Sequence, residues 1–164
     1  MEKVPLGNTG LMVSRLGAGL FEMGREDSPD AEARATRILN AALDAGINFL
    51  DTGECYGLSE ERIGRSVAHR RHEFVLATKV GHVPSGMTGI PWTAETARAS
   101  IDHSLSVMKT DYVDLLQLHA YDAPHPPPDD VLRVVQDARD EGKTRFIGFS
   151  HENDEAGWAV GSGL

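Results

Sequence analysis

The sequence predicts an α/β fold in which short parallel strands alternate with helices, preceded by a β-hairpin. Two observations support this prediction. Five apolar, β-prone runs are separated by segments that mostly carry helical periodicity, and polar side chains able to carry chemistry stand at the ends of those runs. The chain has 164 residues, which corresponds to roughly one domain. We therefore treat residues 1–164 as a single domain.

The hairpin comes first in the chain. Two short runs in the segment VPLGNTGLMVS flank Asn8-Thr9-Gly10, and these residue types favour a tight turn. In a closed barrel such a hairpin would cover the bottom. Five further strands are expected at residues 16–20, 48–51, 74–79, 112–119 and 144–150.

Four helices are expected among these strands. The first has Ser28 as its cap, a proline directly after the cap and Gly46 at its end, and its apolar residues recur at three- and four-residue steps. A shorter helix follows Ser59 and a longer one follows the cap candidate Thr93. The last helix ends at Gly142.

Two loops have distinctive compositions. The segment GHVPSGMTGIP at residues 81–91 is rich in Gly and Pro, fits neither a helix nor a strand, and is long enough to lie over a nearby site at the rim. The triple proline at residues 126–128 predicts a stiff, extended connector before the last helix. A ligand for a proline-recognition domain is the weaker alternative.

Alternating strands and helices allow either an open doubly wound sheet or a closed barrel. An open dinucleotide-binding sheet should carry a G-x-G-x-x-G turn directly after its first strand. Here the first strand runs into the segment GAGLFE at residues 17–22, which lacks the third glycine. The sequence therefore favours a TIM-type (β/α)8 barrel. Because such a barrel usually needs about 250 residues, we expect it to be truncated here to about five β/α units.

Composition excludes several classes of protein. A formal net charge of -9 argues against a nucleic-acid partner. No apolar run approaches the roughly 18 residues of a membrane span, and the amino terminus lacks a signal peptide, so we expect a cytoplasmic protein. A lone Cys55 cannot form an internal disulfide, which agrees with a reducing compartment. We interpret Cys55 as a small loop residue, because no His or Asn context marks it as activated.

Four polar side chains stand at or just past the carboxyl ends of strands, where parallel barrels build their active sites. Taken singly they could be a turn former, a loop aromatic, a solvated strand end and a buried histidine. Together they comprise two ionised groups of opposite sign, a phenol and an imidazole at three consecutive strand ends. This combination favours an active site formed by Asp51, Tyr56, Lys79 and His119.

The sequence also resembles a known family. The segments GINFLDTGECYG, SEERIG, ATKVG, SLSVMKTDYVDLLQLH and GKTRFIGFS follow one another in this order and resemble the aldo-keto reductases, NAD(P)H-dependent barrel enzymes. The match runs from Val4 to about His151. This resemblance implies reduction of aldehydes or ketones to alcohols, with NADP as the cofactor and NAD possible. It places the four residues above in the catalytic tetrad, and it implies that the last strands and the cofactor-phosphate region of the family are missing here.

These residue types suit carbonyl reduction. Hydride transfer leaves negative charge on the carbonyl oxygen, so a group must protonate that oxygen, and Tyr56 is the candidate donor. A free tyrosine has a pKa of about 10, so a neighbouring cation is needed to stabilise the tyrosinate, and Lys79 would provide it. Asp51 would hold the Lys79 ammonium, and His119 would donate a hydrogen bond to the carbonyl.

The resemblance further implies contacts to cofactor and substrate. Ser150 fits the serine that the family uses for the nicotinamide carboxamide, whereas His151 stands where asparagine is commoner. The expected substrate is a small-molecule carbonyl compound. The expected cofactor-binding residues are Gly19, Leu20, Asp51, Ser150 and His151, and the expected substrate-binding residues are Phe21, Tyr56 and His119.

No metal site is predicted. A zinc site drawn from Asp51, His119 and His151 is conceivable in a barrel hydrolase, but no H-x-H motif or carboxylate cluster supports it. The remaining histidines show no ligand spacing and are interpreted as surface residues; they include His69, His72, His82, His103 and His125.

Three functional classes remain. The first is an oxidoreductase of which this chain is the amino-terminal portion, inactive alone. The second is a cofactor-binding regulatory protein on the same scaffold. The third is a half-barrel that assembles with a second chain, because open sheet edges leave unpaired backbone groups and favour self-association.

Overall fold

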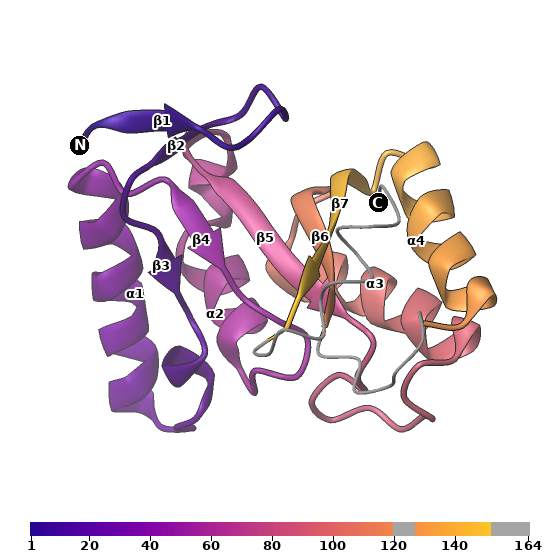
Figure 1. Cartoon of the computed structure of the whole chain (residues 1–164). Helices are drawn as coiled ribbons and strands as arrows, with labels where there is room; N and C mark the ends of the chain where they lie inside the picture. The colour runs from indigo at the N-terminus through magenta and orange to yellow at the C-terminus, as the bar shows by residue number, and fades with distance from the viewer. Residues whose placement is uncertain (120–126, 152–164) are drawn as a thin grey trace.

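The structure, a computed structural model, describes residues 1–119 and 127–151 of the chain. Its centre is a five-stranded parallel sheet with the strand order β3-β4-β5-β6-β7 (Figure 1). Each strand pairs with the next one in the chain, as in a barrel and unlike a doubly wound sheet. The predicted α/β fold is confirmed, with strands β3 (Ala18–Gly19), β4 (Phe49–Asp51), β5 (Val75–Val80), β6 (Val113–His119) and β7 (Thr144–Ser150).

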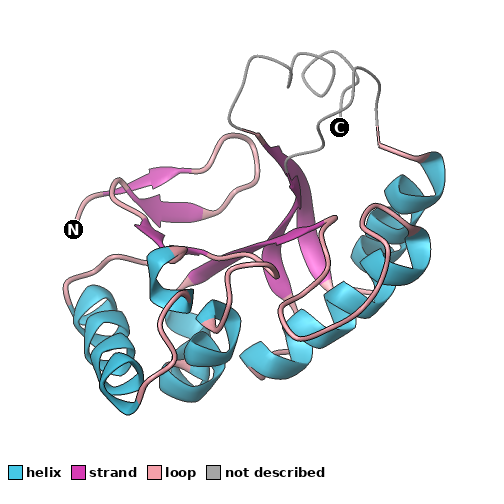
Figure 2. Cartoon of the chain, turned by 90° about the horizontal axis from the view of Figure 1, so that it is seen from below, coloured by secondary structure: helices cyan, strands magenta, loops and turns pink. Residues whose placement is uncertain are grey.

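The α-helices cover one face of the sheet (Figure 2). They are α1 (Pro29–Asp44), α2 (Ser59–Ser66), α3 (Ala94–Met108) and α4 (Asp129–Asp140), and consecutive helices contact one another. Two short 3-10 helices, η1 (Glu22–Gly24) and η2 (Ala68–Glu73), lie in the connections. The main core lies between helices and sheet, where Leu39, Leu50 and Leu118 are almost completely buried.

The predicted helix starts are confirmed at two helices. At α1, the Ser28 hydroxyl accepts a hydrogen bond from the Ala31 N–H at 3.1 Å, and at α3 the Thr93 hydroxyl accepts one from Thr96 at 3.3 Å. Ser59 differs, because it is the first residue of α2 and its side chain does not cap the helix.

The hairpin consists of β1 (Lys3–Pro5) and β2 (Met12–Ser14), which pair antiparallel. Leu11 and Val13 form a second apolar cluster with Val75, the first residue of β5. The partly buried rings of Phe49 and Phe146 pack on this cluster. Since Val75, Phe49 and Phe146 stand at or near the starts of their strands, the hairpin covers the amino-terminal end of the sheet, as predicted for the bottom of a barrel.

The parallel register aligns the carboxyl ends of the strands at the opposite rim. Gly19 pairs with Asp51, and His119 pairs with Ser150. Lys79 lies on β5 two residues beyond the level of Asp51. Side chains from distant parts of the sequence therefore meet at this rim.

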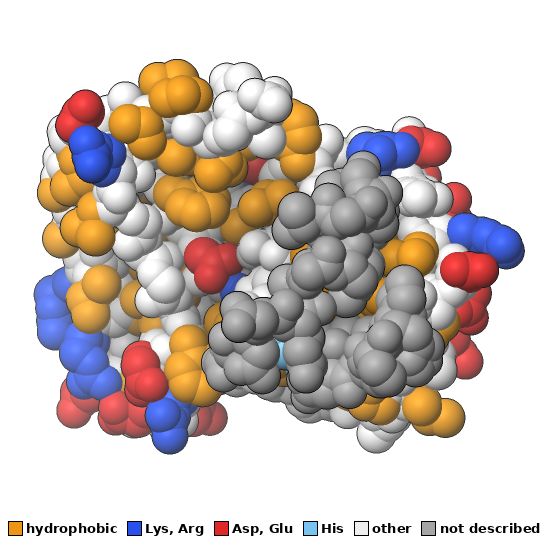
Figure 3. Space-filling model, in the orientation of Figure 1, with side chains coloured by type: hydrophobic (Ala, Val, Ile, Leu, Met, Phe, Trp, Pro, Cys, Tyr) orange, Lys and Arg blue, Asp and Glu red, His pale blue; other side chains and the backbone are white. Residues whose placement is uncertain are grey.

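Side chains are segregated on the molecular face drawn in Figure 3. Hydrophobic side chains gather over the hairpin and the first strands, and charged side chains lie mainly along the margins. Met12, Leu16 and Phe21 are among the exposed large apolar residues. Within the described part of the chain, no helix has the length and apolar character that crossing a membrane requires.

Candidate active site

An ion pair between the buried Lys79 and the partly exposed Asp51 links the carboxyl ends of β4 and β5. The Lys79 Nζ donates hydrogen bonds to Asp51 Oδ2 at 2.9 Å and to the Thr52 carbonyl at 2.7 Å. Nε2 of Gln117 donates to the other Asp51 oxygen at 3.0 Å. The Lys79 side chain is only 3% exposed, so its charge depends on these oxygens for compensation. The pair holds the ammonium in one position.

The ring of Tyr56 lies beside this ammonium. Lys79 Nζ is 4.7 Å from the ring centroid, and the ring centroid of His119 lies 5.6 Å from that of Tyr56. Phe21 packs edge-on against Tyr56, with centroids 5.0 Å apart. The structure therefore brings Asp51, Tyr56, Lys79 and His119 together, with Phe21 beside them; their chemical roles stay predictions.

Glycines let the Tyr56 loop approach its neighbours closely. A Cβ at Gly53 would lie 3.3 Å from atoms of the Tyr56 ring, and one at Gly57, where φ is +57°, would lie 2.2 Å from the Gly24 carbonyl oxygen. The Leu58 N–H donates to the same oxygen at 3.1 Å. The loops after β3 and β4 thus lie backbone to backbone, which positions Tyr56 relative to the residues after β3.

Arg62 anchors the loop that follows β3. Its side chain is almost fully buried in α2, and its guanidinium donates to the carbonyls of Met23 and Glu26. It also donates to the Glu32 carboxylate at 3.3 Å. This loop begins next to Phe21, so Arg62 supports the aromatic wall of the site. The sequence patterns did not indicate this role.

His119 ends β6 in a half-buried position. Burial lowers its pKa to about 4, and the neighbouring His82 and Lys79 act in the same direction. The imidazole is therefore neutral near pH 7. A neutral imidazole still donates one hydrogen bond, which is the role predicted for His119.

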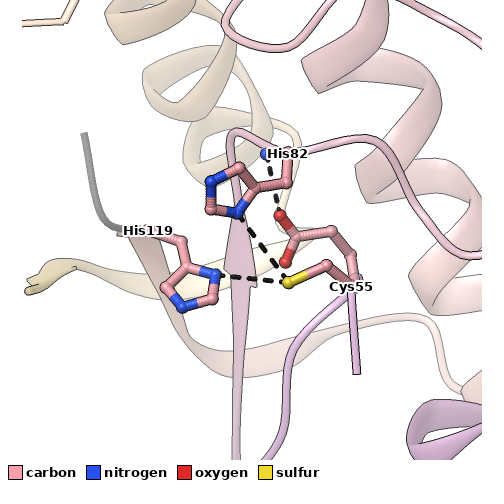
Figure 4. A group of neighbouring side chains, drawn as sticks. Cys55, His82 and His119 are labelled. Atoms are coloured by element: carbon pink, nitrogen blue, oxygen red, sulfur yellow. Dashed lines mark hydrogen bonds between the residues drawn. The ribbon is translucent and has the colours of Figure 1, made fainter. Parts of the chain in front are cut away.

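The surroundings of Cys55 differ from the prediction in two respects, the position of His82 and the presence of histidines beside the thiol, whereas the interpretation of Cys55 as a loop residue that is not activated is not contradicted. His82 is not a surface residue: it is half-buried, its ring centroid lies 4.9 Å from that of His119, and its Nδ1 lies 3.8 Å from the Cys55 sulfur (Figure 4). The same sulfur lies 3.6 Å from Nδ1 of His119, so Cys55 has two histidine neighbours. Burial, together with the Glu54 carboxylate, nevertheless raises the Cys55 pKa to about 11, which argues against a thiolate nucleophile.

The loop at residues 81–91 reaches the rim, as predicted. The His82 N–H donates to Oε1 of Glu54 at 3.0 Å, and the Ser85 N–H donates to the Glu54 carbonyl at 3.2 Å. Glu54 is buried, and burial raises its pKa to about 7. Sequence reasoning missed Glu54, although its position between Asp51 and Tyr56 could have indicated a residue of the site.

Among the expected cofactor-binding residues, Gly19 and Ser150 lie at the rim. A Cβ at Gly19 would meet no atom within 4 Å, so open space adjoins its backbone. Ser150 ends β7 beside His119. His151 follows, with its ring stacked on Phe149 at a centroid distance of 5.9 Å.

Leu20 lies in the core, and its contact with a cofactor stays a prediction. Its side chain is 3% exposed and belongs to the main core. Its N–H donates to the Asp51 carbonyl at 2.9 Å, and its own carbonyl accepts from the Ser59 hydroxyl at 3.0 Å. Leu20 therefore supports the rim from the core, and both its backbone groups are already engaged.

The parallel β/α sheet, the hairpin beneath it and the polar cluster at its carboxyl rim indicate the class of parallel β/α-barrel proteins with a site at the carboxyl ends of the strands. Comparison with protein families narrows this class. The model of the aldo/keto reductase family matches residues 15–158, so the chain belongs to the aldo/keto reductase family, as the sequence resemblance implied.

Individual relatives agree with this assignment. The chain is 38% identical to L-galactose dehydrogenase of Arabidopsis thaliana over 154 residues, which cover 88% of the chain and 47% of that protein. It is 36% identical to 6-dehydroglucose reductase of Novosphingobium aromaticivorans over 160 residues, covering 89% of the chain and 50% of the relative. The holo form of aldo-keto reductase AKR11C1 from Bacillus halodurans superimposes with a TM-score of 0.79 at 35% identity, covering 92% of this chain and 50% of that one. The chain thus spans about half the length of these relatives.

Proposed function

We propose that the protein represented by this chain reduces aldehydes or ketones to alcohols with NAD(P)H, and that Tyr56 is the proton donor. One observation carries the proposal: the Lys79 ammonium, paired with Asp51 at 2.9 Å, lies 4.7 Å from the centre of the Tyr56 ring. A fixed cation beside a phenol favours release of the phenolic proton. Membership of the aldo/keto reductase family supports the same activity.

The residues of the rim suit the individual requirements of the reaction. When bound, a reduced nicotinamide supplies the hydride for the carbonyl carbon. Tyr56 gives its proton to the carbonyl oxygen as negative charge develops there, and Lys79 stabilises the tyrosinate that remains. Neutral His119 donates a hydrogen bond to the same oxygen and so orients the carbonyl group. Phe21 provides an apolar wall next to Tyr56.

The rim also fits the nicotinamide end of the cofactor. Gly19 leaves open space beside its backbone, and Ser150 places a hydroxyl at the end of β7, next to His119. A carboxamide requires hydrogen-bonding partners of this kind. We propose NADP as the cofactor, with NAD as the alternative, and a cytoplasmic location, which the lone Cys55 supports.

The test is carbonyl reduction by Tyr56→Phe in a closed barrel, made by joining this chain to the remaining strands of a relative. We expect the reduction rate to fall about 10²- to 10⁴-fold with unchanged binding of the nicotinamide cofactor. Tyr112→Phe is the matched control, because Tyr112 lies at the other end of the sheet, over Arg71. Sugar-derived aldehydes and ketones belong in the substrate panel, given the names of two relatives. Near-normal turnover by Tyr56→Phe would overturn the proposal.

We also propose that the 164-residue chain has no steady-state reductase activity by itself and self-associates. In the described sheet, β3 and β7 each pair on one side only, which leaves backbone donors and acceptors open. Sedimentation of the purified chain should show species larger than a monomer. A defined oligomer would favour assembly of two half-barrels, whereas robust cofactor-dependent turnover by a monomer would contradict the proposal.

A further inference from the structure

Four potential metal ligands from three separate segments converge beside the proposed catalytic residues. Glu54 and Cys55 belong to the loop after β4, His82 to the loop after β5, and His119 to the end of β6. One donor atom from each residue lies within 4.8 Å of the others. Figure 4 shows the imidazoles of His82 and His119 pointing toward the Cys55 sulfur.

The spacing of these atoms matches that of a tetrahedral site. With a Zn–S bond of about 2.3 Å and a Zn–N bond of about 2.0 Å, tetrahedral angles place sulfur and nitrogen about 3.5 Å apart. The Cys55 sulfur lies 3.6 Å from Nδ1 of His119 and 3.8 Å from Nδ1 of His82. Small side-chain rotations would therefore bring the three atoms around one ion.

Glu54 supplies an independent indication of a ligand. The residue is 2% exposed, and within the described residues its Oε2 atom has no hydrogen-bond partner. Its Oε1 atom accepts from the His82 N–H at 3.0 Å, which holds the carboxylate against the loop that carries His82. A buried carboxylate oxygen without a partner is costly, and coordination of a cation is one way to satisfy it.

We propose that Cys55, His82 and His119, with Glu54 as the fourth ligand, bind a zinc ion. Thiolate, imidazole and carboxylate are the ligand types that zinc prefers, whereas magnesium and calcium prefer sets made of oxygen alone. One thiolate, one carboxylate and two neutral imidazoles balance the two positive charges of the ion. Binding releases the Cys55 thiol proton to solvent. The neighbouring Lys79 ammonium is already paired with Asp51.

Such an ion would affect catalysis, a consequence that rests on the proposed function. The His119 ring already faces Cys55, and zinc on its Nδ1 would fix it there with the ring proton on Nε2. The ion would also place a second cation near Tyr56. We therefore expect turnover to change reversibly when zinc is added and to be restored by a chelator. Binding itself is measured without catalysis, so failure of the site and failure of the proposed function are distinguishable.

The test uses Co²⁺ and Zn²⁺ on the full chain. We expect one Co²⁺ per chain, with the visible absorption of a tetrahedral ion and an ultraviolet thiolate-to-cobalt band, and displacement of Co²⁺ by Zn²⁺. Cys55→Ser should abolish the thiolate band, and His82→Asn should weaken Zn²⁺ binding by at least the roughly 10- to 100-fold that loss of an outer-shell partner costs. The matched control is His72→Asn, at an exposed histidine elsewhere, which should leave both signals unchanged.

The spectrum of the unchanged chain decides the question even if a variant fails to fold. An octahedral spectrum without a thiolate band would overturn the proposal. So would Zn²⁺ affinity that drops equally in His82→Asn and His72→Asn, since that result would show adventitious binding to surface histidines.

Discussion

Two buried carboxylates lie at opposite ends of the same sheet and differ in how completely their oxygens are paired. Asp114 lies near the start of β6, at the end covered by the hairpin. Glu54 lies in the loop after β4, at the rim that carries the candidate active site. Both side chains are almost completely removed from solvent.

Both oxygens of the Asp114 carboxylate have hydrogen-bond donors, and two of these donors are arginines. One of its oxygens accepts hydrogen bonds from the Leu76 N–H at 2.9 Å and from Arg71 at 2.7 Å, and the other accepts from Arg145 at 2.8 Å. The Arg71 guanidinium also lies 4.3 Å from the centroid of the Tyr112 ring. Opposite charges and a backbone donor thus satisfy both oxygens of Asp114.

Glu54 has one backbone donor at Oε1 and, among the described residues, no partner at Oε2. Its pKa is raised to about 7, mainly by burial. The Asp114 carboxylate at the bottom of the sheet is therefore fully paired, whereas the Glu54 carboxylate at the rim is not. This difference fits the division of parallel barrels into a bottom that provides stability and a top that provides chemistry.

The largest stability effect is expected at the bottom, from Asp114→Asn. The substitution leaves two guanidinium groups near a neutral amide, and breaking a buried ion pair in this way costs about 3–5 kcal/mol. Urea denaturation followed by circular dichroism measures the change. A loss below about 1 kcal/mol would show that the Asp114 cluster is not what stabilises this end.

The helices, the strands and the residues at the strand ends could be predicted from the sequence. Helix α1 was predictable because Ser28, Pro29 and the apolar spacing act within a few residues of one another. The strands were predictable because apolar runs are bounded by turn residues, although β3 is reduced to Ala18–Gly19 from the expected run at 16–20. The residues of the proposed tetrad were found because strand ends in a parallel sheet share one rim.

The contacts between loops could not be predicted from the sequence. Cys55 and His82 are separated by 27 residues, and their meeting depends on the path of the loop after β5. Arg62 sits in a helix whose charged residues suggest exposure, and only the closeness of the loop after β3 explains its burial. The direction of the Leu20 side chain could not be predicted, because a residue at a strand end can face either the rim or the core and the spacing of Gly19 and Leu20 does not distinguish them.

The second-largest effect on stability is expected from Glu60, another buried carboxylate behind the rim. Glu60 of α2 is buried, accepts a hydrogen bond from Thr78 and faces the charges of Glu54 and Lys79; burial raises its pKa to about 7. Between pH 4.5 and 7 the unfolded chain loses this proton while the folded chain keeps it, so the contribution of Glu60 to stability falls as the pH rises. The total is at most about 3 kcal/mol.

The measurement is the difference in unfolding free energy between the unchanged chain and Glu60→Gln across pH 4.5–7. Glutamine cannot ionise, so the variant should gain stability relative to the unchanged chain as the pH rises. Glu61→Gln is the matched control, because Glu61 lies on the same helix but pairs with Arg65 at 2.6 Å on the surface. A difference that stays constant over this range would contradict the assignment.

The smallest effect on stability is expected from Arg145→Gln. This substitution tests how much each of the two arginines beside Asp114 contributes. The Arg145 side chain is 50% exposed whereas that of Arg71 is 14% exposed, so water already screens the contact of Arg145 with Asp114. Arg145→Gln should therefore cost about 0–1 kcal/mol, and Arg71→Gln should cost several-fold more, because Asp114 would lose its buried partner. Urea denaturation of both variants gives the ratio. Equal losses would mean that Asp114 depends on the sum of the two charges, and that the burial of Arg71 between Tyr112 and Phe74 adds nothing to the pair.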